Sequence, residues 1–188
     1  MATMLEGFHQ IASPAILSIV ARRNGEPESA VLKGFTTAMT AMAATIASRS
    51  RDRGFLKDLM VVAGETAKAP DALTAIGCVV AVAPSVDTAT VSGRWLSRLF
   101  GHELSSVIDR VAFYAGIRRS SAVSILSAVA PLVLTYFGRL MRKEHVTISD
   151  LAMRLRKERA HAVASLPRDF DLLHLTAVSG ETQPRHRA

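Results

Sequence analysis

The sequence predicts an all-helical protein in which two diverged copies of one helical unit pack as a single body. Three observations predict this class. Apolar residues make up 49% of the chain but aromatic residues only 5%, and the apolar ones are mostly aliphatic or small, as in packed helices. They recur at helical spacing in several segments. Two segments also repeat each other in register, which is how helical repeat units are detected.

The repeat relates residues 16–59 to residues 107–151. Residue types match at a constant offset, and the register continues after one inserted residue in the second copy. The clearest pairs are Ala21 with Ala112, Gly25 with Gly116, Ser29 with Ser120, Phe35 with Leu126, Arg51 with Arg142, Asp58 with Asp150, and Leu59 with Leu151. Because type and register both persist, the pattern predicts an internal duplication.

Each copy begins with a short amphipathic helix that ends at a glycine. Gly25 and Gly116 are expected where the chain turns through a left-handed conformation. A long, nearly uncharged helix follows, from about residue 28 to 51 and again from about 120 to 143, and helices of this kind are buried on all sides. Pro131 falls inside the second one, where proline removes a hydrogen bond and is expected to kink or break the helix.

A shorter third helix closes each copy. In the second copy, Thr147 and Asp150 have the spacing of a capping box, and Ile148, Leu151, Ala152 and Leu155 form an apolar stripe. The expected domain division is a first repeat over 1–83, a linker over 84–93, a second repeat over 94–178 and a disordered tail over 179–188.

The second copy resembles the YidB-like bacterial family, a domain of unknown function (number 937). The resemblance covers roughly residues 93–169 and rests on Leu99-Phe100-Gly101, Ala115-Gly116-Ile117, Ser120-Ser121, Leu126, Ala130-Pro131-Leu132-Val133, Gly138, Asp150-Leu151 and Leu166-Pro167. The first copy has Thr40 in place of the motif's proline. The resemblance implies a multihelical fold and brings no activity, cofactor or catalytic residue with it.

Several classes of protein are disfavoured by composition. Cys78 is the single cysteine, so an intrachain disulfide or a clustered thiolate site cannot form, and a reducing compartment, the cytoplasm, is expected. Residues 1–10 lack the basic start of a signal peptide. The uncharged run over 120–138 contains Pro131 and several hydroxyl residues, so we expect a buried core helix and no membrane span.

No pattern of residues predicts a catalytic, metal or nucleotide site. The histidines are scattered and have no metal-ligand spacing. Glu144 beside His145 and Glu158 near His161 bring acids close to imidazoles, but no nucleophile accompanies them. The glycines form no phosphate-binding motif. We therefore expect neither an enzyme nor a bound cofactor or metal.

Charge is the remaining signal. Residues 1–93 hold eight basic and eight acidic side chains, whereas residues 94–188 hold fifteen and eight, so the whole net charge of +7 lies in the second half. The basic residues are densest at the end of the second long helix and on the helix that follows. The candidate anion- or partner-binding residues are therefore Arg139, Arg142, Lys143, Arg154, Arg156, Lys157 and Arg159.

Two hypotheses for function remain. The favoured one is a non-enzymatic helical module that associates with copies of itself, as a homo-oligomer, or with another protein. Stacking or pairing is the simplest function for a duplicated helical unit that has few candidate catalytic residues. The alternative is a nucleic-acid-binding protein that uses its basic C-terminal half. An anionic membrane would attract the same surface.

Overall fold

The structure, a computed structural model, describes residues 3–11, 13–66, 90–167 and 170. All of the elements in this part of the chain are helices, which confirms the predicted all-helical class. In chain order they are α1 (Met4–Ile11), α2 (Pro14–Asn24), α3 (Glu28–Ser48), α4 (Arg53–Thr66), α6 (Val91–Phe100), the 3₁₀ turn η1 (Gly101–Glu103), α7 (Leu104–Ala115), α8 (Arg119–Glu144) and α9 (Ile148–Ala164).

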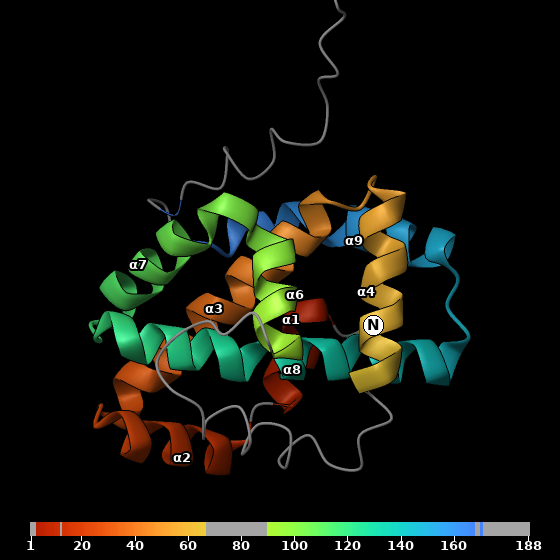
Figure 1. The fold of residues 1–188 in the computed structure, drawn as a ribbon. Helices are drawn as coiled ribbons and strands as arrows, with labels where there is room; N and C mark the ends of the chain where they lie inside the picture. The colour runs from red at the N-terminus through yellow and green to blue at the C-terminus, as the bar shows by residue number, and fades with distance from the viewer. Residues whose placement is uncertain (1–2, 12, 67–89, 168–169, 171–188) are drawn as a thin grey trace, which may run out of the picture.

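The two long helices, α3 and α8, form the centre of the core. Every residue is buried over 37–47 of α3 and over 128–135 of α8. Both are long and apolar enough to cross a membrane, but 72% and 83% of their most apolar 18-residue stretches are buried inside the fold. Figure 1 shows α8 running across the width of the molecule, with α2 below it and α9 above it. Their apolar character is thus accounted for by contacts within the chain.

Two buried threonines of α3 are compatible with this burial because their hydroxyl groups are hydrogen-bonded. The hydroxyl groups of Thr40 and Thr45 donate to the carbonyl oxygens of Thr36 and Ala41, each at 2.8 Å. Such back-bonding satisfies a hydroxyl without a partner from another helix. Threonine can therefore occupy a core helix at low cost.

Two glycine turns join the short helices to the long ones. Gly25 after α2 has φ 61°, and Gly116 after α7 has φ 65°, the left-handed values expected at these positions. In both turns the next amide bonds back into the helix: Glu26 N donates to Ala21 O at 3.1 Å, and Ile117 N donates to Ala112 O at 3.0 Å. The two turns therefore have the same cap.

The turns also meet each other through Glu26. One carboxylate oxygen, Oε1, accepts from Ser121 Oγ at 2.7 Å and from both the backbone N and Nε of Arg118 at 3.1 Å. Arg118 also donates to the carbonyl oxygen of Asn24. The Ser121 hydrogen bond, together with those from Arg118 and its charge, lowers the pKa of Glu26 below 4.5 despite partial burial. The carboxylate thus ties the start of α8 to the end of α2.

The third helices cross over between the halves. α4 packs most extensively on α8, and α9 packs most extensively on α3. The two stretches predicted to be copies thus have the same order of elements, and each covers the long helix of the other. The duplication itself stays a prediction.

The structure differs from the sequence analysis at three places. α8 does not break at Pro131. The residues on either side of Pro131 are buried by neighbouring helices, which hold α8 together. The carbonyl oxygen that loses its backbone donor belongs to Ser127, which is only half-buried. Residues 91–93, assigned above to the linker, form the first turn of α6, where Thr90 Oγ1 accepts from Gly93 N at 3.0 Å. α1 was not predicted, although it buries Met4, Leu5 and Phe8.

Several predictions concern residues outside the described part of the chain. They include Cys78, the linker over 84–89 and the tail over 179–188. The capping box of α9, in contrast, lies among the described residues and is present as predicted. Asp150 N donates to Thr147 Oγ1 at 3.2 Å, and Thr147 N donates to Asp150 Oδ2 at 3.0 Å.

We predict that Glu26→Gln lowers the free energy of unfolding by about 1.5 kcal/mol at neutral pH, because hydrogen bonds to a charged acceptor become bonds to a neutral one. The pKa of Glu26 is lower in the folded protein, so its contribution is present above about pH 4.5 and is lost as pH falls through the folded value. The difference between wild type and variant in urea unfolding should therefore shrink as the pH falls below 4.5. A difference that is constant with pH, or equal to that of Glu65→Gln on exposed α4 surface, would contradict this role.

We predict that Gly34→Val lowers the free energy of unfolding by about 1–3 kcal/mol through overpacking. A Cβ on Gly34 would lie 2.7 Å from Cδ1 of Ile125 and 3.4 Å from Cδ1 of Ile117. Ile125→Val removes the nearer methyl group, so the double variant should lose less stability than the sum of the two single variants. Strict additivity in chemical denaturation would show that these two positions do not limit how closely α3 and α8 approach.

Candidate anion-binding surface

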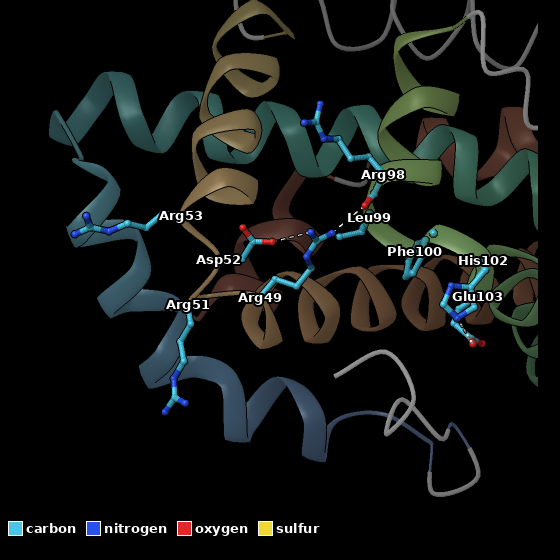
Figure 2. A pocket seen from close by; sticks show the side chains of 10 residues that line it. Arg49, Arg51, Asp52, Arg53, Arg98, Leu99, Phe100, His102 and Glu103 are labelled. Atoms are coloured by element: carbon cyan, nitrogen blue, oxygen red, sulfur yellow. Dashed lines mark hydrogen bonds and ion pairs between the residues drawn. The ribbon is translucent and has the colours of Figure 1, made fainter. Parts of the chain in front are cut away.

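The most arginine-rich hollow lies where α3 ends, α4 begins and α6 ends. It has a volume of about 590 Å³. Its lining includes four arginines, which are Arg49, Arg51, Arg53 and Arg98. Figure 2 shows these side chains spreading from the turn between α3 and α4 and from the last turn of α6. The arginines come from parts of the chain that are far apart in sequence.

Two of the four arginines are held by carboxylates. Arg49 pairs with Asp52 at 2.8 Å and lies 4.1 Å from the centroid of the Phe55 ring. It also donates to the carbonyl oxygen of Arg98, whose own guanidinium pairs with Asp58 on α4. These contacts join the α3–α4 turn to α6, so both arginines have a structural role.

Asp52 has a second role as the cap of α4. Its Oδ1 accepts from Phe55 N at 2.9 Å. That hydrogen bond, followed by the one from Arg49 and its charge, lowers the pKa of Asp52 below 3.8 against the effect of partial burial. Asp52 is therefore ionised at neutral pH, and its two carboxylate oxygens already accept hydrogen bonds from Arg49 and Phe55.

Arg51 and Arg53 are different because both are exposed and, within the described residues, neither has a carboxylate at ion-pair distance. In Figure 2, Arg53 points away from the Arg49–Asp52 pair and Arg51 extends toward α9. These two guanidinium groups thus keep all their donors available to a ligand.

The first three turns of α9 extend the basic surface. A smaller hollow of about 220 Å³ is lined by Arg51, Arg53 and Arg156, together with Ser50, Ile148, Ser149 and Ala152. A shallow hollow beside it is lined by Arg156 and Lys157 with Ser149, Asp150 and Met153. We call Arg51, Arg53, Arg156 and Lys157 the arginine face. It combines cations from the α3–α4 turn and from α9.

Among the residues that line these two hollows, the acidic one is Asp150. Its Oδ2 accepts from Thr147 Oγ1 at 2.6 Å and from Thr147 N at 3.0 Å. These bonds lower its pKa below 3.8. Because the carboxylate is used to cap α9, it is not paired with Arg156 or Lys157.

The seven residues predicted from sequence do not form one site. Arg139, Arg142 and Lys143 are exposed on the last turns of α8, and Arg159 is exposed on α9. Arg154 pairs with Glu144 across the α8–α9 turn, and this pairing raises its pKa. Of the seven, Arg156 and Lys157 line the hollows described above.

Sequence reasoning missed Arg51 and Arg53, although a signal was present. Arginine occupies alternate positions 49, 51 and 53, but counting charges over the whole first half concealed this run. Two acids of that half, Asp52 and Asp58, pair with Arg49 and Arg98. If the charges of residues 49–58 are counted alone and these two acids are assigned to Arg49 and Arg98, Arg51 and Arg53 are left without an acidic partner.

The acids and histidines of α8 and α9 do not converge. Glu144 pairs with Arg154, and Glu158 accepts a hydrogen bond from the backbone of Met4. Within the described part of the chain, no three His, Cys, Asp or Glu side chains come together as metal ligands. The arginine face is thus equipped to bind anions.

One family of known proteins matches the chain. The family described as bacterial proteins of unknown function (DUF937) matches residues 8–139. The match begins in α1 and ends in α8, so it includes the first half of the chain rather than being concentrated in the second. No curated protein and no solved structure matches the chain. Because the matched region covers more than half of its length, this chain belongs to the DUF937 family of bacterial proteins of unknown function.

Proposed function

We propose that this protein is a non-enzymatic module that binds the phosphate backbone of nucleic acid through the arginine face. The observation that carries the proposal is that Arg51, Arg53 and Arg156 line one hollow, where none of their guanidinium groups is neutralised by a carboxylate of the described residues. Guanidinium groups bind phosphate oxygens through two parallel hydrogen bonds, so such a cluster is well suited to a phosphate chain.

Two further features favour nucleic acid as the ligand. The chain carries a net charge of +7, which attracts polyanions over long range. The arginine face has no aromatic member, so stacking of single-stranded bases has no platform there. Contacts made by these cations alone would read phosphates rather than bases, and we therefore expect binding to duplexes with little sequence preference.

We predict that the full chain binds a duplex DNA with an affinity that falls steeply with salt, and that the triple variant Arg51→Gln/Arg53→Gln/Arg156→Gln binds more weakly. If each arginine neutralises one phosphate, the slope of log K against log salt should become shallower by about 2–3, since each contact contributes about 0.9. Fluorescence anisotropy at several salt concentrations measures both quantities.

The matched control is Arg22→Gln/Arg23→Gln/Lys33→Gln, which removes three exposed cations from α2 and α3. This control should keep most of the affinity. Equal losses in the two triple variants would mean that net charge, and not the arginine face, drives binding. Absence of binding by wild type at low salt would remove the proposal.

Self-association is a second candidate, favoured by one observation on α7. Phe113 is 79% exposed and borders a hollow of about 520 Å³ lined also by Ser106, Asp109, Arg110 and Tyr114. Aromatic residues are enriched at protein–protein interfaces, where a partner covers them. The long helices give this candidate little support, because their apolar side chains are buried or partly buried within one chain except for Leu32 of α3.

We predict that, if this face joins two copies, light scattering will give a mass that rises with concentration and that Phe113→Ser will return the protein to a monomer. Truncating an aromatic residue at the centre of an interface commonly costs more than 2 kcal/mol of binding free energy. Leu32→Ser, at another exposed apolar position, is the control. A monomer at high concentration in wild type would rule self-association out.

We also infer that the two halves are diverged copies and that the chain belongs to the YidB-like branch of its family. The shared caps at Gly25 and Gly116 and the equal order of helices support the duplication. The Ala130–Val133 segment in α8 supports the narrower family assignment.

A further inference from the structure

We propose that the 220 Å³ hollow between the α3–α4 turn and the start of α9 is a site for a single phosphate group, held by Ser50, Arg51, Arg53, Ser149 and Arg156. This inference deepens the proposed function and rests on it for the natural ligand, a phosphodiester of a nucleic-acid backbone. The same chemistry would accept a free phosphate or a phosphomonoester, so the experiment below distinguishes these sources.

The first argument is the position of Ser50. This residue lines the hollow and is only 4% exposed. Its amide donates to Ala47 O at 3.2 Å, which fixes the backbone of Ser50 directly after α3. A serine hydroxyl is a hydrogen-bond donor to a phosphate oxygen. Ser50 therefore adds a neutral donor to the three guanidinium groups that line the same hollow.

The second argument is the balance of charge around the hollow. Three guanidinium groups line it and no acidic residue does. Arg156 uses Nε to donate to Ala152 O at 3.2 Å, which orients the side chain while leaving its terminal nitrogens available. The acids that lie closest in sequence, Asp52 and Asp150, are engaged with Arg49 and Thr147. Inside such a hollow an anion would meet donors and no competing carboxylate.

The third argument is the position of α9, a helix of 17 residues whose first two, Ile148 and Ser149, line the hollow. The first amides of a helix have no partner in its own hydrogen-bond ladder. The capping box supplies one to Asp150 N, the third amide. The positive end of the helix dipole adds to the attraction for an anion.

The volume of the hollow limits what it can hold. Small-molecule sites usually have volumes of about 300–1,000 Å³, whereas this hollow has about 220 Å³. Its lining also has no aromatic side chain on which a base could stack. A single phosphate group therefore fits better than a whole nucleotide.

The test is a titration of the ¹⁵N-labelled full chain with inorganic phosphate at constant ionic strength, followed by amide NMR, and a parallel titration with duplex DNA. We expect saturable shifts at Ser50, Ser149 and their neighbours. Ser50→Ala should weaken phosphate binding about tenfold, because a hydrogen bond to a charged acceptor is lost. Arg156→Gln changes an exposed side chain that lines the hollow and should weaken phosphate binding at least as much, whereas Arg23→Gln on α2 should not.

The outcomes separate the two proposals. Saturable phosphate binding that both pocket variants weaken supports the site, and a parallel loss of DNA binding supports the phosphodiester as its natural ligand. Phosphate shifts that are spread over the surface, or unchanged in Ser50→Ala and Arg156→Gln, overturn the site even if DNA binding persists. Saturable phosphate binding without DNA binding overturns the proposed function and leaves the site to a free phosphate or phosphomonoester.

Discussion

The structure depends on the burial of α3 and α8 against each other and against the helices around them. Between their charged ends both helices are almost free of charge, so these central parts are stable in water only when they are covered on all sides. Their approach is close at Gly34, where a side chain would collide with Ile125. Gly34 and Ile125 are separated along the chain by the same number of residues as Gly25 and Gly116. They are therefore equivalent positions in the two predicted copies, and they meet where α3 packs on α8.

The covering helices are exchanged between the halves, and this exchange determines where the cations go. Because α9 packs on α3 and α4 packs on α8, the first turn of α9 lies beside the turn between α3 and α4. Arg51 and Arg53 of the first half thereby meet Arg156 of the second. The arginine face is thus a consequence of how the core is covered, and an isolated half would not contain it.

Polar contacts then stabilise the crossing at its ends. Glu26 binds Arg118 and Ser121 where the two glycine turns meet, and Arg49 binds both Asp52 and the carbonyl oxygen of Arg98 where α3, α4 and α6 meet. The Glu26, Arg49 and Asp52 side chains are partly shielded from water, which makes their hydrogen bonds stronger than those of fully exposed pairs. They also remove acids from competition, so that the remaining arginines stay available for an external anion.

The sequence by itself determined the all-helical class, the two long core helices, the glycine turns and the cap of α9, because helical periodicity and capping preferences act over a few residues. It could not determine the fate of Pro131, since burial by neighbouring helices keeps α8 continuous there. Nor could it determine which cations stay unpaired: Arg154 is neutralised by Glu144, whereas Arg51 and Arg53 keep free guanidinium groups. Pairing depends on which helix ends the fold brings together, so only the tertiary structure decided that the arginine face would combine both halves of the chain.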